Sequence, residues 1–182
     1  MNVIVAITGA SGAIYARQCI DILLADSSVE RIALVISHHG EDVIKAEGIT
    51  LPEDGRIERY DNDDMWSSLA SGSASWGAML VVPASMGSVG RIASGVSQSL
   101  IERAADVMLK ERRRLVLVVR ETPYSLIHLR NMTTITEAGG IILPASPSFY
   151  IPADNIEELA LSVSYRAVEL LGLSVAHPAW GN

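Results

Sequence analysis

Five apolar runs recur along the chain and predict the strands of a parallel sheet. Each is a continuous stretch of Val, Ile, Leu, Ala or Met, and continuous runs are typical of strands covered on both faces. The runs occupy residues 3–7, 32–36, 78–83, 115–119 and 141–143. A shorter and more polar stretch, residues 56–60, predicts an exposed strand.

Segments with helical spacing separate these runs. The last is the clearest, because its apolar residues between Ile156 and Leu171 form one stripe that Gly172 closes. The predicted helices cover 13–26, 41–47, a segment from 89 with a break near Gly95, 100–111, 127–138 and 156–171. Strands that alternate with helices predict an α/β fold with a doubly wound parallel sheet. A length of 182 residues predicts one domain, which a short tail, 173–182, follows.

Small polar residues follow three of the predicted strands. The segments are Gly9-Ala-Ser-Gly12, Ser37-His-His-Gly40 and Ser85-Met-Gly-Ser88. Ligands of open α/β sheets lie outside the carboxyl ends of the strands, so we expect one flat, phosphate-bearing ligand across these ends, with an anion site at the start of the first helix. The first segment has only two of the three glycines of a dinucleotide fingerprint. Ser and Gly also simply make good turns.

Charged residues define a second candidate site. Arg120 and Glu121 end a buried strand, where charges need a partner or a function. The preceding helix places Arg103, Asp106 and Lys110 on one face, where Arg103 and Asp106 also suit a plain ion pair. If they converge, Arg103, Lys110 and Arg120 form a second anion site, which Tyr150 and Arg166 are placed to join.

Composition narrows the class of protein. A net charge of −7 argues against nucleic acid as the main partner. The single cysteine, Cys19, excludes a disulfide within the chain and suits a reducing cytoplasm, and no apolar run approaches a membrane span. The four histidines lack carboxylates at metal-ligand spacing, so we expect no metal. An apolar content of 49% with only 5% aromatics fits either subunit burial in a homo-oligomer or an aliphatic core.

At this point the sequence resembles the flavin prenyltransferase family, the UbiX/Pad proteins, over nearly its whole length. The resemblance is carried by Thr8-Gly-Ala-Ser-Gly-Ala13, Pro83-Ala-Ser-Met86, Leu100-Ile-Glu-Arg-Ala-Ala-Asp-Val107, Leu109-Lys-Glu-Arg112, Leu115-Val-Leu-Val-Val-Arg-Glu121, Ile127-His-Leu-Arg-Asn-Met132, Pro144-Ala-Ser-Pro-Ser-Phe-Tyr150 and Trp180. Family members usually have Cys at the position of Ala84 and Asn in the stretch Gln98-Ser99.

The resemblance implies a flavodoxin-like, Rossmann-type three-layer subunit, which joins a dimethylallyl group from its monophosphate to reduced FMN without a metal. The prenylated FMN would go to a UbiD-type decarboxylase, and the assembly would be a dodecamer with sites lined by more than one subunit. By match to the motifs, the residues that hold FMN would be Gly9, Ala10, Ser11, Ser37, Ser85, Met86, Gly87, Ser88 and Arg120. Those that hold or shield the prenyl donor would be Arg103, Lys110, Tyr150, Arg166 and Trp180. Glu121 and Glu47 would handle protons, with Ser11 near the reacting flavin edge and Lys110 on the donor phosphate.

Two other functions stay open from the sequence. An FMN-dependent cysteine decarboxylase would share the fold and the FMN site, but its Pro-x-Met-Asn-x-x-Met-Trp substrate clamp is missing here. A non-catalytic flavin carrier would bind FMN without turnover and would not need the cations Arg103, Lys110 and Arg166.

Overall fold

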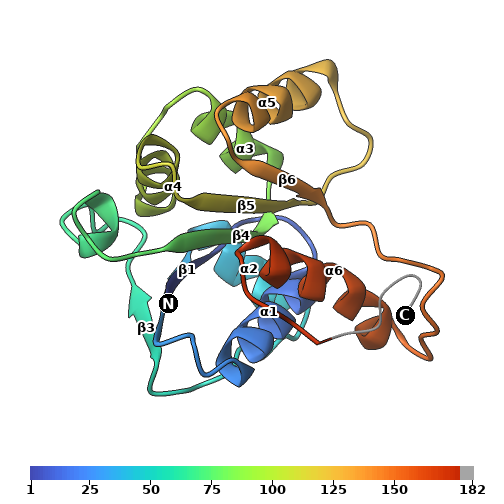
Figure 1. Ribbon diagram of the computed structural model, residues 1–182. Helices are drawn as coiled ribbons and strands as arrows, with labels where there is room; N and C mark the ends of the chain where they lie inside the picture. Colours follow the sequence, from blue (N-terminus) through green and yellow to red (C-terminus); the bar gives the residue numbers. More distant parts are fainter. Residues whose placement is uncertain (177–182) are drawn as a thin grey trace.

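A computed structural model describes residues 1–176, which form a six-stranded, wholly parallel sheet (Figure 1). The strands are β1 (Asn2–Ile7), β2 (Arg31–Ile36), β3 (Ile57–Tyr60), β4 (Ala78–Ala84), β5 (Arg114–Val119) and β6 (Ile141–Pro144). Their order is β3-β2-β1-β4-β5-β6, that of the Rossmann fold. The chain therefore reverses its direction of winding between β1 and β4, where such sheets bind ligands.

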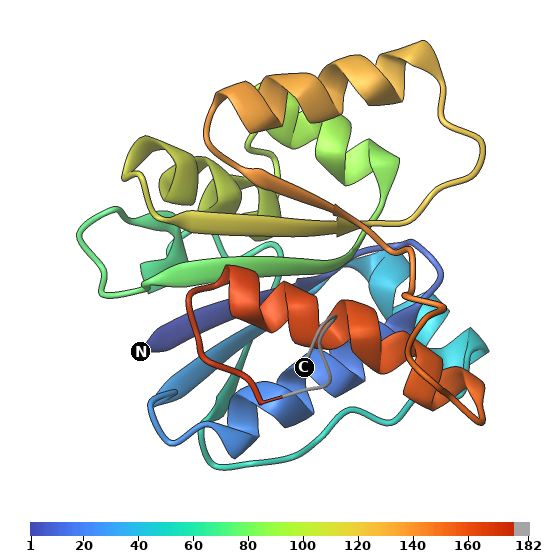
Figure 2. The same ribbon diagram turned by 45° about the vertical axis from the view of Figure 1, so that its right-hand side comes forward.

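Helices cover both faces of the sheet, as Figure 2 shows. They are α1 (Ala13–Ala25), α2 (His38–Ala46), α3 (Met86–Ala93), α4 (Leu100–Lys110), α5 (Leu126–Glu137) and α6 (Ile156–Leu170). One apolar core joins the sheet to α1 and α6, and the other joins it to α3, α4 and α5. The structure confirms the predicted doubly wound parallel sheet in a three-layer α/β/α fold.

Burial on both faces explains the continuous apolar runs. In β1, Ile4 and Ala6 pack into the core with α3 and α4, whereas Val3, Val5 and Ile7 pack into the core with α1 and α6. All five side chains have no exposed surface. Because neighbouring side chains of a strand point to opposite faces, neither face leaves a position for a polar residue.

Two helices begin earlier than their apolar spacing predicts. Helix α2 begins at His38 because the hydroxyl of Ser37 accepts a hydrogen bond from the Gly40 amide at 3.1 Å. Helix α3 begins at Met86 because Ser85 accepts one from the Ser88 amide at 3.3 Å. The segments after β2 and β4 are therefore N-caps and first turns of helices, where we had expected loops.

The single cysteine lies in the core. Cys19 of α1 is fully buried, and burial raises the pKa of its thiol to about 12, so it is not a nucleophile at neutral pH. Within residues 1–176, no helix is long and apolar enough to cross a membrane. The same residues contain no cluster of three His, Cys, Asp or Glu side chains placed to hold a metal ion.

Candidate functional site

A cavity of about 370 Å³ lies at the carboxyl ends of β1, β2 and β4, on one side of the point where the winding reverses. Its lining residues are Gly9, Ser37, His38, His39, Asn62, Ser85, Gly87, Ser88, Arg91, Ser99, Ile101 and Glu102. Five of these, Gly9, Ser37, Ser85, Gly87 and Ser88, belong to the predicted FMN set. The volume falls within the range of ~300–1,000 Å³ that small-molecule sites occupy.

Thr8 joins the two strand ends that flank this crevice. Its side chain is 1% exposed, and its hydroxyl donates to the Pro83 carbonyl at 2.8 Å. The same hydroxyl oxygen accepts a hydrogen bond from the Ser85 amide at 2.8 Å. The loop after β1 is thereby fixed against the start of α3.

Replacing Thr8 with Val is expected to destabilise the protein by ~1–3 kcal/mol, because the Ser85 amide loses its acceptor in a buried place. FMN affinity should fall with it, since Ser85 lines the cavity. Urea unfolding and an FMN titration measure the two effects. Thr133→Val is the matched control, because its hydroxyl bonds only the Leu129 carbonyl on an exposed part of α5. Equal stabilities of the two variants would contradict this role for Thr8.

The donors around the cavity suit a phosphate group. Helices α2 and α3 both begin at its wall, and helix N-termini favour anions. Ser37 caps α2 with its oxygen and keeps its hydroxyl hydrogen as a donor. The hydroxyls of Ser85 and Ser88 lie 3.1 Å apart on the first turn of α3, and the Arg91 guanidinium adds a positive charge. These groups fit the phosphate end of FMN.

The loop after β1 differs from the expected anion site. Both oxygens of the Glu47 carboxylate accept from the Gly12 amide, at 2.9 and 3.2 Å, and one accepts from the Ala13 amide at 2.7 Å. The N-terminus of α1 therefore holds a carboxylate of its own chain, where we had expected a ligand. A role of Glu47 in proton transfer stays a prediction.

Gly9 is required by a neighbouring helix. A Cβ on Gly9 would lie 2.6 Å from the Cβ of His39 in α2, so only glycine lets the β1 loop and α2 approach this closely. The two residues that follow do not line the cavity: Ala10 is buried, and Ser11 is exposed to solvent. Contacts of Ala10 and Ser11 with FMN stay predictions.

Met86 points away from the cavity. Its side chain is 7% exposed and packs into the core with α3 and α4, so its side chain is not part of the cavity wall, although the motif had placed it among the FMN ligands. Its backbone starts α3 and thereby helps to place Ser85 and Gly87.

Arg120 and Glu121 lie directly after β5, at the same edge of the sheet. The charge of Arg120 acts on Tyr15 of α1, whose phenol pKa is nevertheless raised because burial outweighs it. Arg120 therefore reaches toward the loop after β1. Glu121 is half-buried, and its Oε1 accepts a hydrogen bond from the Thr122 amide at 2.9 Å. Neither residue lines the cavity, but both follow β5 at the ends of the strands where the cavity lies.

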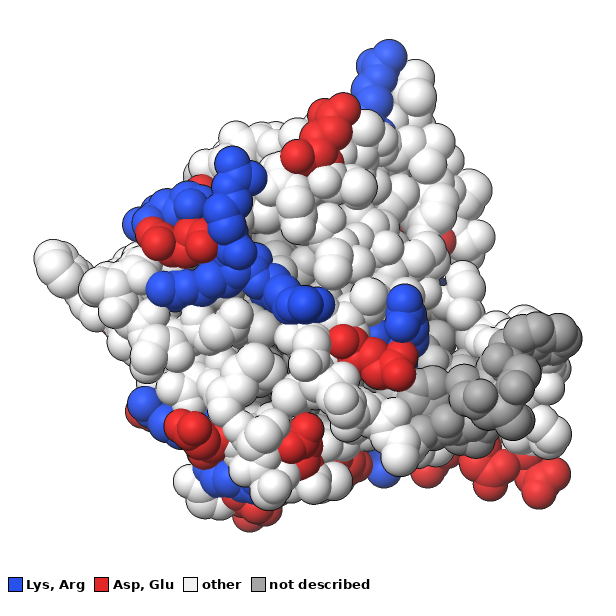
Figure 3. All heavy atoms as spheres, in the orientation of Figure 1, with Lys and Arg blue, Asp and Glu red and all other residues white. Residues whose placement is uncertain are grey.

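Lys110 and Arg120 lie at opposite ends of β5, Lys110 before its first residue and Arg120 after its last. Helix α4 ends at Lys110, and the Arg113 amide bonds the Met108 carbonyl just before β5 begins. Strand β5, six residues long, then separates the two by about 20 Å. Lys110 pairs with Glu111 and belongs to a basic cluster with Arg112, Arg113 and Arg114, which Figure 3 shows over the end of α4. One chain therefore does not bring Lys110 to Arg120.

The other predicted donor residues are also dispersed within one chain. Arg103 pairs with Asp106 at 2.6 Å, which confirms the ion pair, and its Nε donates to the Ala70 carbonyl at 3.1 Å. Arg166 pairs with Glu169 at 3.2 Å, one turn before α6 ends beside Arg114. Tyr150 is 56% exposed on the loop between β6 and α6. Trp180 lies outside the described residues.

Seven lining residues were not among the predicted site residues: His38, His39, Asn62, Arg91, Ser99, Ile101 and Glu102. Arg91 had a signal in the sequence, because Ser85, Ser88 and Arg91 recur at intervals of three, which is one face of a helix. The helix predicted from residue 89 leaves out Ser85 and Ser88, so it does not place Arg91 on one face with them.

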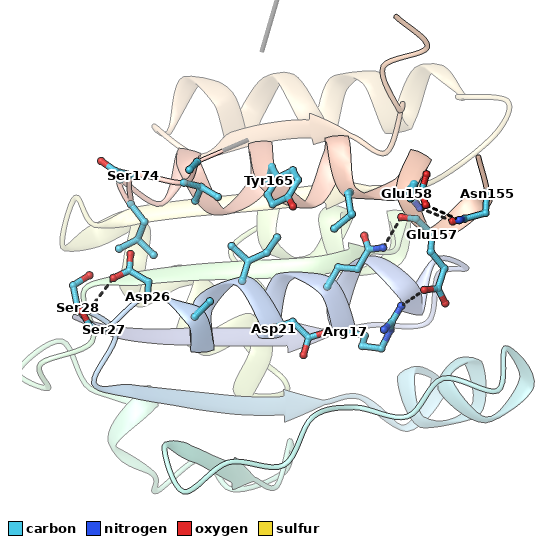
Figure 4. Close-up of a pocket in the computed structure, with 18 residues that line it drawn as sticks. Arg17, Asp21, Asp26, Ser27, Ser28, Asn155, Glu157, Glu158, Tyr165 and Ser174 are labelled. Atoms are coloured by element: carbon cyan, nitrogen blue, oxygen red, sulfur yellow. Dashed lines mark hydrogen bonds and ion pairs between the residues drawn. The ribbon is translucent and has the colours of Figure 1, made fainter. Parts of the chain in front are cut away.

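A larger hollow of about 1070 Å³ lies elsewhere, between α1, α6 and residues 172–176 (Figure 4). Arg17 and Glu157 form an ion pair of 3.2 Å there, and Gln18 donates to the Glu157 carbonyl at 2.7 Å. It runs along the outer sides of two helices, and none of the predicted site residues lines it. The smaller cavity at the strand ends is therefore the candidate site.

The chain is similar to known flavin-binding proteins. The sequence profile of the Flavoprotein family matches residues 1–162. The flavin prenyltransferase UbiX of Methanocaldococcus jannaschii is 40% identical over 176 residues, which are 95% of this chain and 94% of that protein. A crystal structure of AnUbiX (PadA1) in complex with FMN and dimethylallyl pyrophosphate is 41% identical, with a TM-score of 0.89 and 98% of each chain covered. A dodecameric FMN-dependent UbiX-like decarboxylase from Escherichia coli O157:H7 is 32% identical, with a TM-score of 0.91 over 100% of both chains. The chain belongs to the Flavoprotein family and, within it, to the flavin prenyltransferases of the UbiX type.

Proposed function

We propose that this protein transfers a dimethylallyl group from dimethylallyl monophosphate to reduced FMN. The observation that carries the proposal is the cavity at the carboxyl ends of β1, β2 and β4, which has phosphate-binding donors in its wall. Arg120 follows β5 at the same ends of the strands, where its amide donates to the Ala84 carbonyl of β4 at 3.3 Å. Its relative AnUbiX was crystallised with FMN and dimethylallyl pyrophosphate, and that structure covers 98% of this chain. We further propose that prenylated FMN passes to a UbiD-type decarboxylase.

Each group of side chains has a separate task. Ser37, Ser85 and Ser88 hold the phosphate of FMN, whose reduced ring is the acceptor of the prenyl group. Arg120 serves the flavin side, and cations such as Lys110 stabilise the charge that develops on the departing phosphate of the donor. The Glu121 carboxylate takes up the proton that is released as transfer is completed.

A second copy of the chain completes the donor site in this proposal. Lys110 lies near the start of β5, whereas Arg120 and Glu121 follow its end. A Lys110 side chain that reaches the donor beside Glu121 must therefore come from another subunit. Large apolar side chains are available for contacts between copies, since Trp66 is 97% exposed and Phe149 83%. We propose a homo-oligomer, as in the dodecameric relative from Escherichia coli O157:H7.

Mass spectrometry of the flavin tests the proposal directly. Purified protein is incubated with reduced FMN and dimethylallyl monophosphate, and the flavin should gain the mass of one prenyl group. Dimethylallyl pyrophosphate is the comparison donor and should react more slowly. An unchanged flavin mass with FMN bound would support a carrier, and carbon dioxide release from a cysteine peptide would support the decarboxylase.

The location follows from the same proposal. A protein that passes a flavin to a decarboxylase must be in the same compartment as that decarboxylase. Cys19 is a buried free thiol, which fits a reducing compartment. We therefore propose the cytoplasm.

A further inference from the structure

Helix α3 directs three polar side chains at the candidate cavity. Ser85, Ser88 and Arg91 follow one another at intervals of three residues, and all three line the cavity together with Gly87. Ser85 and Ser88 belong to the phosphate-binding motif that the sequence predicts. Arg91 adds a cation to the same face, but it was not among the predicted site residues and has no task in the function proposed above.

The guanidinium of Arg91 folds back over the first turn of α3. Its Nη2 donates to the Ser88 hydroxyl at 3.4 Å, and its Nη1 lies 3.3 Å from the point where a Cβ on Gly87 would stand. Helical side chains lean toward the N-terminus, which brings the guanidinium beside the amides at the start of α3. Within residues 1–176, Nη1 has no hydrogen-bond acceptor.

The Glu102 carboxylate of α4 holds the Arg91 guanidinium in this position. Its side chain is 4% exposed, and its Oε1 accepts from Nε of Arg91. The other oxygen accepts from the amides of Gln98 and Ser99, at 2.9 and 3.1 Å, in the capping box of α4. Because α4 holds the carboxylate, the guanidinium has one preferred orientation at the cavity wall.

A cation beside a helix N-terminus is electrostatically unfavourable, since both are positive. Glu102 compensates one charge, yet the cavity wall still combines the start of α2, the start of α3, hydroxyl donors and a guanidinium. A phosphate monoester, with up to two negative charges, is the complementary ligand.

We propose that Arg91 binds the terminal phosphate of FMN directly and that Glu102 is its positioning residue; this rests on the proposed function. The assignment makes the site selective for FMN over riboflavin.

Titrations of two flavins test the assignment. Arg91→Ala should weaken the binding of FMN by about 10- to 100-fold, the loss of one charge-assisted pair, and leave riboflavin affinity unchanged. Arg130→Ala is the matched control, because it removes one exposed cation of α5 away from the cavity and should change neither. Equal weakening of both flavins, or no change in either, would overturn the assignment.

A second variant separates binding from folding. Arg91→Ala leaves a buried carboxylate without its cation, so the double variant Arg91→Ala/Glu102→Gln removes both charges and keeps an acceptor for the α4 cap. It should recover the unfolding midpoint and keep the wild-type riboflavin affinity, while the deficit toward FMN remains. A double variant that also recovers FMN affinity would show that Arg91 acts only through stability.

Two further probes identify the phosphate. If Arg91→Ala leaves FMN affinity intact but raises the KM for dimethylallyl monophosphate, Arg91 binds the donor, and the assignment to FMN is wrong. If the wild-type protein binds no flavin, the proposed function fails. Thermal-shift titration with inorganic phosphate then judges Arg91 alone: stabilisation that Arg91→Ala removes supports a phosphate site, and its absence in the wild-type protein refutes one.

Discussion

Glu121→Gln is expected to slow prenyl transfer by ~10²–10⁴-fold while FMN binding stays at the wild-type level. The substitution removes a proton acceptor and retains the shape of the side chain. It also retains an oxygen that can accept the hydrogen bond which the Thr122 amide donates to Glu121 at 2.9 Å. The local turn is therefore preserved, and the change reports on chemistry. The measurement is single-turnover formation of prenylated FMN per bound flavin.

A purely structural role of Glu121 makes the opposite forecast. If the carboxylate serves only to cap its own turn, the Gln variant should turn over each bound flavin at the wild-type rate. That result would remove Glu121 from the mechanism and leave the released phosphate as the base. Glu137→Gln, an exposed change at the end of α5, is the matched control and should leave both rate and binding unchanged.

The fold was accessible from the sequence because its cores impose a simple pattern. Both faces of the central strands are covered, so continuous apolar runs mark them, and Gly172 ends α6 with a φ of 92°. The starts of α2 and α3 were less accessible. Their first turns contain Ser, His and Gly, which are common in turns too, and only the capping bonds of Ser37 and Ser85 distinguish the two structures.

The candidate site was predicted in part, and the errors have physical causes. Motif residues after β2 and β4 do line one cavity. The N-terminus of α1 was assigned to a ligand, yet Glu47, 35 residues from Gly12 in sequence, occupies it. No local sequence pattern predicts a hydrogen bond between residues so far apart in the chain. Arg91 and Glu102 pair across two helices, so their partnership likewise depends on the tertiary fold.

The position of Lys110 follows from topology alone. A helix between two parallel strands runs back to the start of the next strand. Its last turn therefore lies at the amino ends of the strands, whereas the candidate site lies at their carboxyl ends. Helical spacing correctly placed Lys110 on one face with Arg103 and Asp106, but spacing does not tell which edge of the sheet a residue reaches. Lys110 therefore needs a second subunit to take part in the reaction.

Lys110→Ala is expected to weaken donor use by ~2–5 kcal/mol and to spare FMN binding, because the proposed function assigns Lys110 to the donor phosphate of a neighbouring copy. Its effect on kcat/KM is measured at saturating FMN. Arg112→Ala, which removes an exposed cation two residues away, is the control and should have a small effect.

Co-expression of Lys110→Ala and Glu121→Gln chains, each with its own tag, then shows whether a site is shared. In a mixed oligomer, about a quarter of the sites would combine Glu121 from one chain with Lys110 from another, so activity should return to roughly that fraction of the wild-type level. If both residues serve a site within one chain, every site of the mixture lacks one of them. A tandem-purified mixture as inactive as its parents would therefore place Lys110 outside the donor site of neighbouring subunits, and a monomeric mass by light scattering would do the same.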